Sequence, residues 1–322
     1  MIVDLPNTTT AQISKALVTI REEGGAVALG RVLTLVISTT LGQEEDAIEA
    51  ANDASREHPM RVIVLSWVVG VDSVDELRLD AEIRVGGDAG ASEVIVLRVR
   101  GAEGVDDEGL VTGLLLPDAP VVAWWPGLAP EKVSESTLGR IASCRLTDSA
   151  AQEDPGAFLQ GISTNYSPGD VDFAWTRLTL WRAQLAAVLD QPPYETITGV
   201  KVHGASDSPS TLLLAAWLQL QLQVTVEYEL TDPHEAPAGI HGVTLSRASG
   251  DIRLERPHST VATLTQPNQP VHDISLPRRS LRDCLAEELR RLDPDDLFGQ
   301  VVTTGLRQLG EPTTTRHDQG TE

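Results

Sequence analysis

A strand-to-helix loop in the second half of the chain has the residue types of an anion-binding site. The pattern predicts a strand that ends at His203 and a helix that begins near Pro209. The candidate anion-binding residues are Gly204, Ser206, Ser208 and Ser210. Helix N-termini present unpaired N–H groups and the positive end of the helix dipole, so a sugar phosphate or a carboxylate could bind there. Ordinary serine capping of the loop explains the same residues and stays open.

Two other clusters are weaker candidates for a binding site. The segment GGDAGASE, residues 86–93, has enough glycine for backbone N–H groups to converge on an anion, but its place between two alternating strands favours a plain hairpin loop. Asp232, His234 and His241 lie close in sequence. They flank a proline-containing loop, which favours solvated turn residues, and we expect no metal site.

The standard catalytic motifs are missing from the chain. It contains no GxxxxGK[ST], GxSxG, HExxH or CxxC pattern, and no GxGxxG follows a predicted strand. The seven histidines are not clustered like metal ligands. The sequence therefore favours a protein that is not an enzyme, with no catalytic residues, no cofactor and no metal.

A second group of residues has the chemistry of a partner-binding hot spot. Aromatic residues make up only 4% of the chain, yet Trp124 and Trp125 are adjacent where a strand ends, and Pro126 after them would leave Trp125 presented. Trp175 and Arg182 share a mixed aromatic and polar helical face, and Trp and Arg are enriched in hot spots. We expect these four residues to contact a partner. Core packing is the open alternative: a central strand would bury the adjacent pair on opposite faces, and Arg182 would stack on Trp175.

The elements that position these residues begin with a mixed α/β domain over residues 1–150. A capping-box spacing from Thr9 to Gln12 precedes a helix through residue 20. Two apolar strands, RVLTLVIST and RVIVLSW, flank an alanine-rich helical stretch that ends before Pro59. Alternating apolar residues over 77–85 and 95–99 predict two strands around a glycine-rich turn, and PVVAWW predicts another strand.

A second domain is expected over residues 171–310. Residues 151–170 gather Asp, Pro, Gly and Ser without periodicity, which is typical of a linker. Helices over 172–189 and 209–222, strands over 197–203 and 224–230, and three short strands with a Ser-Gly-Asp turn follow. Capping signals at Ser280 and Asp293 predict a terminal helix pair, and residues 311–322 predict a flexible tail. The expected fold class is α/β: two mixed α/β domains, each with a sheet packed by helices, plus C-terminal helices.

Composition limits the partners and the compartment. The chain has 47 Asp and Glu against 25 Lys and Arg, and its formal charge of −22 repels nucleic acid and anionic lipid. Cys144 and Cys284 cannot form a disulfide framework, and the apolar helix stripe beside Cys284 favours an inert buried thiol. No apolar run approaches the roughly 18 to 20 residues of a spanning helix. We expect a soluble, cytoplasmic protein that binds neither nucleic acid nor membrane.

Several long blocks of the chain resemble one known family. They are EEGGAVALGRVLTLV, AIEAANDASREHPMRVIV, EIRVGGDAGASEVIVLR, LLLPDAPVVAWWPG and DFAWTRLTLWRAQLAAVLD, with LLLAAWLQLQL as a weaker continuation. In this order they resemble the OpcA family of glucose-6-phosphate dehydrogenase assembly proteins. The resemblance implies a non-catalytic partner that binds the dehydrogenase and supports its active oligomer, and it carries no catalytic residues onto this chain.

Two functions follow as expectations. The first is an assembly or activating partner of glucose-6-phosphate dehydrogenase that binds the active oligomer more tightly than its dissociated form. The second is a regulatory sensor in which the loop over residues 204–210 binds a sugar-phosphate effector. Binding of glucose 6-phosphate to the isolated protein separates the two.

Overall fold

The computed structural model describes residues 1–23, 30–67, 78–86, 93–101, 107–234, 237–258 and 260–310 of the 322-residue chain. The fold is mixed α/β with two sheets, each packed by helices, as the sequence predicts. The chain divides into two compact units. Unit 1 holds Met1–Ala151, Ser167–Asp172 and Ser280–Pro294, and unit 2 holds Gln152–Tyr166, Phe173–Arg279 and the chain from Asp295 on.

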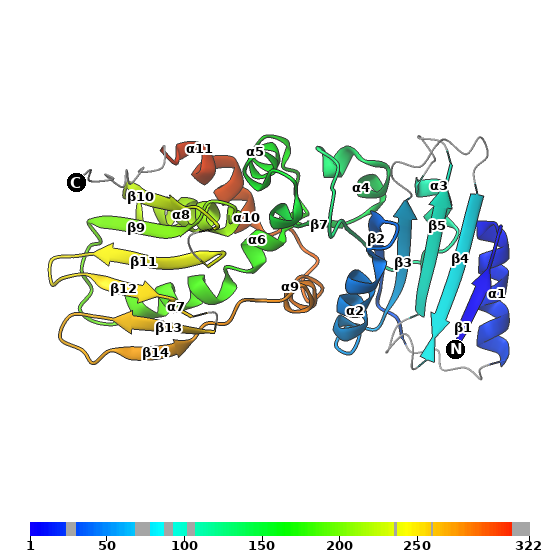
Figure 1. Cartoon of the computed structure of the whole chain (residues 1–322), viewed down its shortest axis with the longest axis horizontal. Helices are drawn as coiled ribbons and strands as arrows, with labels where there is room; N and C mark the ends of the chain where they lie inside the picture. The colour runs from blue at the N-terminus through cyan, green and yellow to red at the C-terminus, as the bar shows by residue number, and fades with distance from the viewer. Residues whose placement is uncertain are drawn as a thin grey trace, which may run out of the picture. The chain divides into compact units, whose positions relative to one another are not determined.

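The sheet of unit 1 has eight strands in the order β1-β4-β5-β3-β2-β6-β7-β8. Their bounds are β1 Ile2–Leu5, β2 Leu33–Thr40, β3 Met60–Trp67, β4 Arg78–Val85, β5 Glu93–Arg100, β6 Val121–Trp124, β7 Cys144–Thr147 and β8 Asp170–Asp172. Figure 1 shows β2, β3, β5, β4 and β1 side by side. The run from β5 to β8 is parallel throughout, and β4 and β1 add antiparallel at one edge. This is a doubly wound order, in which the direction of winding reverses between β2 and β6.

Burial explains the apolar runs in the middle of the central strands, residues 35–37 in β2 and 62–65 in β3. β2 and β3 are buried along nearly their whole length, as expected for parallel strands covered on both faces. The helices of unit 1 are α1 Thr10–Glu23, α2 Glu44–Ala54, α3 Asp107–Thr112, α4 Thr137–Ile141 and α9 Leu281–Glu288, with short 3₁₀ turns at Val133–Glu135 and Ser149–Ala151. Helix α1 begins at the predicted capping box, because the Thr9 N–H donates to Gln12 Oε1 and the Gln12 N–H donates to Thr9 Oγ1.

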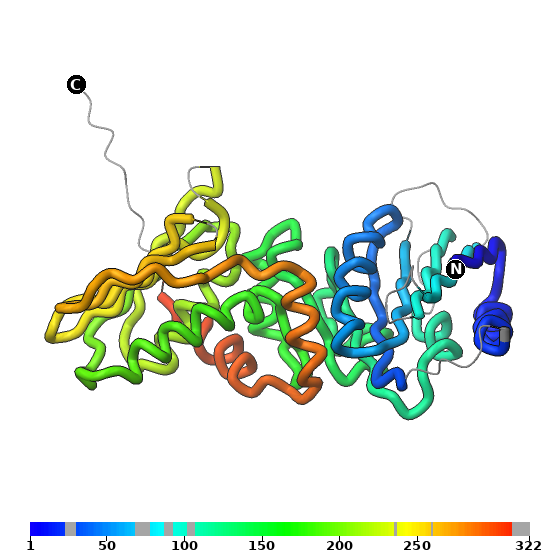
Figure 2. The backbone as a smooth tube through the Cα atoms, turned by 90° about the horizontal axis from the view of Figure 1, so that it is seen from below, coloured from blue at the N-terminus to red at the C-terminus, as the bar shows by residue number. Residues whose placement is uncertain are grey.

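The sheet of unit 2 has six strands in the order β10-β9-β11-β12-β13-β14. Their bounds are β9 Gly199–Ala205, β10 Val226–Thr231, β11 Ile240–Ser246, β12 Ile252–Glu255, β13 Val261–Thr265 and β14 His272–Ser275. β9 and β10 are parallel and joined by α8, Pro209–Leu222, and every other pair is antiparallel. Seen in Figure 2, β11 to β14 form one layer with α7, Thr179–Leu189, along one side. The buried side chains of α7 and α8 join those of the strands in one apolar core.

The remaining helices of unit 2 complete that core. They are α5 Pro155–Asn165, α6 Phe173–Thr176, α10 Asp296–Gln300 and α11 Leu306–Gln308, with a π-helical turn over Val301–Gly305. None of the helices in the described ranges is both long enough and apolar enough to span a bilayer.

The predicted linker over residues 151–170 is wrong. The range holds helix α5 and the start of strand β8. Asp154 caps α5 by accepting from the Ala157 N–H at 2.9 Å, and Pro155 occupies the first helical position. Strand β8 is held by Arg145 of β7, whose buried guanidinium pairs with Asp170. The chain therefore enters unit 2, returns to unit 1 for β8, and enters unit 2 again.

Two other predicted elements differ in their bounds. The helix expected over 172–189 is two helices, α6 and α7, because Asp172 belongs to β8 and its carboxylate accepts from the Thr147 hydroxyl and the Ser149 N–H. The first of the terminal helices, α9, begins at the predicted Ser280 capping box but lies in unit 1. The second, α10, is capped by Asp295 and not by Asp293.

Candidate partner-binding site

The reversal of winding between β2 and β6 marks the place where doubly wound sheets bind ligands. β2 ends at Thr40 and β6 ends at Trp124, and both strands run in the same direction. The two following loops lie side by side, because a Cβ placed on Gly127 would lie 3.9 Å from Gln43 Oε1. We call the residues 41–43 and 125–128 at this edge the switch loops.

The adjacent tryptophans are core residues. Trp124 is 0% exposed and Trp125 is 4% exposed, so the expectation that Trp125 is presented on the surface is wrong. Pro126 does end β6, but the Trp125 N–H still donates to Leu146 O on β7 and continues the sheet by one residue. Trp125 packs on the face that α1 covers with Ile13, whereas Trp124 follows on the opposite face of the pleat. Core packing, the alternative interpretation of the sequence, therefore explains why Trp124 and Trp125 are adjacent.

Trp175 is also buried, at 1% exposed. Its Nε1 donates to Asp295 at 2.8 Å, and its ring lies 5.8 Å from that of Phe298. The half-buried Arg182 guanidinium stacks over the Trp175 ring, with Cζ 3.7 Å from its centroid. The predicted mixed face is thus an internal cation–π contact within unit 2. That these four residues affect partner binding stays a prediction, and the structure leaves Arg182 as the member with accessible surface.

The exposed apolar side chains at the switch loops are leucines. Leu128 is 60% exposed three residues after the buried Trp125, and Leu41 is 37% exposed after β2. Trp67, at the end of the neighbouring β3, is half-buried, and its carbonyl accepts from the Leu41 N–H at 2.8 Å. Sequence reasoning missed these leucines because it weighted the rarer tryptophans. The signal available was an apolar residue directly after the Pro126-Gly127 strand end.

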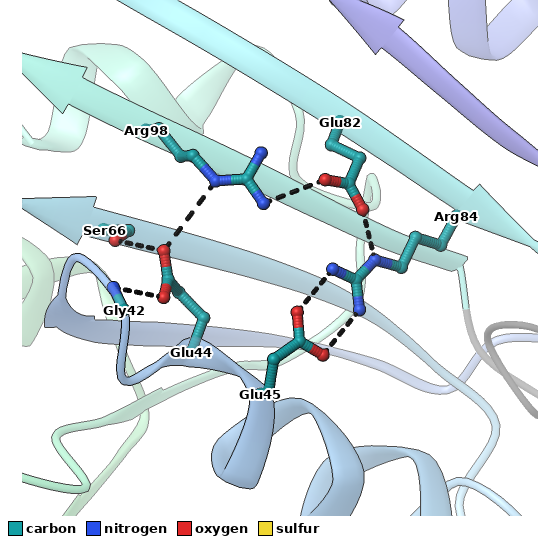
Figure 3. A network of polar contacts seen from close by, with 7 residues as sticks. All are labelled: Gly42, Glu44, Glu45, Ser66, Glu82, Arg84 and Arg98. Atoms are coloured by element: carbon teal, nitrogen blue, oxygen red, sulfur yellow. Dashed lines mark hydrogen bonds and ion pairs between the residues drawn. The ribbon is translucent and has the colours of Figure 1, made fainter.

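Beside the switch loops, the first turn of α2 is filled with the chain's own carboxylates. Glu44, Glu45 and Asp46 all lie in that turn. The Glu44 carboxylate is buried; it accepts from the Gly42 N–H at 2.6 Å and from the Ser66 hydroxyl at 2.7 Å (Figure 3). In nucleotide-binding sheets the N–H groups of the equivalent helix hold phosphate. Here those carboxylates would repel a phosphate.

Two arginines from the neighbouring strands close this network, as Figure 3 shows. Arg84 of β4 donates from both Nη atoms to Glu45 at 2.9 and 2.6 Å and from Nε to Glu82. Arg98 of β5 donates to Glu82 at 2.8 Å and lies 3.8 Å from Glu44. The Arg84 hydrogen bond holds the pKa of Glu45 below its usual value. Burial acts to raise the pKa of Glu82, but the hydrogen bonds from Arg84 and Arg98 outweigh it and lower that pKa.

The predicted anion loop over residues 204–210 uses its polar groups internally. The Ser210 hydroxyl donates to Ala174 O at 2.8 Å, and the Ser206 and Ser208 N–H groups donate to Thr231 O and Ala205 O. Gly204 is required for close packing, because a Cβ there would lie 2.4 Å from Thr211 Oγ1. Ser208 is the N-cap of α8, but its side chain makes no capping hydrogen bond. Anion binding by this loop stays a prediction, and three of its donors, the Ser210 hydroxyl and the Ser206 and Ser208 N–H groups, already have partners within unit 2.

The cysteines and the other candidate clusters add no site. Cys144 and Cys284 are both buried and form no disulfide, and burial raises the pKa of Cys144 to about 12. In the part of the chain that the structure describes, no three His, Cys, Asp or Glu side chains gather as metal ligands. The predicted glycine nest at residues 86–93 lies outside the described residues except at its two ends.

Two family models match the chain, and both describe parts of a glucose-6-phosphate dehydrogenase subunit. The model of the N-terminal domain matches residues 51–164, and the model of the C-terminal domain matches residues 168–302. No curated protein matches the chain.

Among solved structures, the chain is similar to KijD10, a 3-ketoreductase from Actinomadura kijaniata, with 9% identity, a TM-score of 0.42 and coverage of 86% of this chain and 96% of that one. It is also similar to a structure described as trehalose-6-phosphate from E. coli bound with UDP-2-fluoro glucose, with 9% identity, a TM-score of 0.25 and coverage of 62% and 65%. At these TM-scores neither likeness carries an argument about fold or function.

Proposed function

The chain belongs to the OpcA family of glucose-6-phosphate dehydrogenase assembly proteins, and on this premise we propose that it is a non-catalytic partner that binds that enzyme and favours its active oligomer. The observation that carries the proposal is the extent of the family match. It spans residues 51–164 and 168–302, and so includes strands of both sheets. The proposed role therefore involves both units of the chain and not a single segment.

The mechanism of such a partner is differential affinity. A protein that binds one state of an enzyme more tightly than another shifts the enzyme toward the state it prefers, by no more than the difference in binding free energy. A rigid surface suits this role because little conformational entropy is lost when it docks. The switch loops meet that requirement, since they follow buried central strands and Trp125 fixes the start of one of them in the core.

We place the proposed contact at the switch loops, with Leu128 and Leu41 as its apolar residues. Both are exposed on adjacent loops, where doubly wound sheets present their binding surface. Glu45 and Glu44 of α2 are paired with Arg84 and Arg98, so this edge presents apolar groups beside a rim of fixed charged groups. A polar rim around apolar anchors is the usual arrangement of a protein interface.

The same edge supports a non-catalytic role. A phosphate-bearing substrate or dinucleotide would need the N–H groups at the start of α2, and that turn carries Glu44, Glu45 and Asp46. The thiol of Cys144 is also unsuited to nucleophilic chemistry, because its pKa of about 12 keeps it protonated at neutral pH. The net charge of −22 in turn suggests a basic surface on the partner.

A pair of matched variants tests the proposed contact. Leu128→Asp places a charge in the proposed interface, and we expect it to weaken binding of the dehydrogenase by about tenfold or more, as for a central apolar contact. Val271→Asp is the control, because Val271 is also 60% exposed and also lies outside helices and strands. Binding is measured by biolayer interferometry with immobilised dehydrogenase. Equal affinities for the two variants would contradict the placement at the switch loops.

A further inference from the structure

A cavity of about 270 Å³ in unit 2 is lined by basic residues in an otherwise acidic protein. It lies where β11 begins and where the chain leaves β12 and β14 (Figure 1). The polar side chains that line it are Arg256, Arg278, His241 and His258. No carboxylate lines it among the residues that the structure describes.

The fold brings the two guanidinium groups to the same point. Arg256 directly follows β12; its N–H donates to His241 O at 2.7 Å and its Nη2 donates to Ile240 O at 3.0 Å. Arg278 follows β14. Gly239 has φ +91, and a Cβ on it would lie 3.2 Å from Nη2 of Arg278 and 3.3 Å from Nη2 of Arg256. Glycine at this position therefore permits both the turn and the approach of the two guanidinium groups.

Within the described ranges, no neighbouring carboxylate compensates the charges of the two arginines. Burial, and then the charge of Arg278, lowers the pKa of Arg256 to about 10, so that Arg256 is still protonated at neutral pH. The Arg256 guanidinium lies 5.3 Å from the centre of the Trp181 ring, which orients it but supplies no negative charge. Arg84 and Arg145, in contrast, each have a carboxylate partner in unit 1. A partly buried positive charge without a counterion is costly, which is the situation that a bound anion relieves.

We propose that this cavity binds a phosphate group, either as the free ion or as the phosphate of a small ester. Guanidinium groups match the oxygens of a phosphate with paired N–H donors, and the bond from Arg256 Nη2 to Ile240 O leaves its other side-chain donors for a ligand. His241 Nε2 lies 2.5 Å from Pro237 O, so its N–H donates to that carbonyl and the two guanidinium groups are the donors for the ligand. The cavity is smaller than the roughly 300–1,000 Å³ of pockets for drug-sized ligands, which suits a phosphate better than a dinucleotide.

This site is distinct from the loop over residues 204–210 but adjoins it. Ile240 pairs with Gly204 in the sheet, and the Ala205 N–H donates to Gly239 O at 2.9 Å. Several N–H and hydroxyl donors of the 204–210 loop bond within the protein. On the neighbouring strand side, Arg256 and Arg278 offer donors to a ligand. The sequence hides them because Arg256 and Arg278 lie far from the loop along the chain.

Calorimetric titration of the full-length protein, without dehydrogenase, tests the proposal. Inorganic phosphate and glucose 6-phosphate are the probes, and uncharged glucose is the control ligand. We expect both phosphates to bind and glucose not to bind, and Arg278→Gln to weaken phosphate binding by about tenfold or more, as for loss of a charge-assisted contact. Arg278 is exposed, so its replacement should leave the fold intact, whereas Arg256→Gln is the second, more buried variant.

Arg253→Gln is the matched control, because Arg253 lies on the same strand β12 and pairs with Asp251 outside the cavity. Tighter binding of the ester would identify an esterified ligand, and equal binding would identify the free ion; both outcomes support the proposal. The proposal would be overturned if neither inorganic phosphate nor glucose 6-phosphate bound. It would also be overturned if Arg253→Gln weakened phosphate binding as much as Arg278→Gln does. Loss of dehydrogenase binding in Arg278→Gln without any phosphate binding would instead assign the cavity to a carboxylate of the partner. Because no dehydrogenase is present in the titrations, their failure is separate from failure of the proposed function.

Discussion

At the scale of single residues, the tryptophans show what residue types can and cannot predict. A chain poor in aromatics made Trp124, Trp125 and Trp175 conspicuous, but all three are buried, and the exposed residue near the first two is Leu128. Whether the last residue of a strand is presented or covered depends on the next strand in the sheet. Here the Trp125 N–H donates to Leu146 O of β7, and that hydrogen bond joins positions far apart in sequence.

Burial of Trp124 predicts a large loss of stability on truncation. Trp124→Ala should lower the free energy of unfolding by about 3–5 kcal/mol, because it removes a fully buried aromatic from a central strand and leaves a cavity. Leu128→Ala should change it by no more than about 0.5 kcal/mol, because that side chain is mostly exposed. Urea unfolding followed by far-ultraviolet circular dichroism measures both, and similar losses for the two variants would contradict the packing described.

The burial of both cysteines predicts that neither thiol reacts with a thiol reagent in the folded protein. At neutral pH neither thiol should react with Ellman's reagent in the native state, because both are buried and the raised pKa of Cys144 removes its thiolate. Both should react once the chain is unfolded in urea. Fast reaction of either thiol in the folded protein would show that the thiol is accessible. Redox control through that cysteine would then again be a candidate mechanism.

At the scale of elements, local signals were predicted well and long-range ones were not. The capping boxes at Thr9 and Ser280 were visible in the sequence because they involve neighbouring residues. The start of α5 was visible too, as Asp154 before Pro155, but the loop-like composition around it concealed the helix. The break after Asp172 could not be predicted, since it depends on hydrogen bonds to Thr147 and Ser149 of another element.

The network between α2 and the strands of unit 1 predicts a pH dependence. The pKa values of Glu45 and Glu82 lie below their usual values, so these carboxylates stabilise the fold above their unfolded pKa, and that stability is lost as the pH falls through their folded values. Arg84→Gln should therefore be less stable than the wild type at neutral pH, and should lose less stability between pH 5 and strongly acidic pH. Urea unfolding across this pH range measures the difference. Parallel pH profiles for the two proteins would mean that Arg84 does not hold these carboxylates.

At the scale of the whole molecule, the pattern of helices and strands predicted the α/β class but not its arrangement. The order of the eight strands in unit 1 depends on pairings between distant segments, such as β2 with β6. The placement of α9 with unit 1 also requires the folded chain. The switch point, and with it the candidate partner-binding edge, could be located only once that order was known, whereas the resemblance of several blocks to one family was readable from the sequence alone.

The central claim is that the chain binds glucose-6-phosphate dehydrogenase and favours its active oligomer. Size-exclusion chromatography with light scattering, run on this protein mixed with the dehydrogenase of the same organism and assayed for activity across the peak, tests it most directly. We predict one peak that is heavier than either protein alone, with a higher specific activity than the dehydrogenase run by itself. Separate peaks with unchanged specific activity would contradict the account.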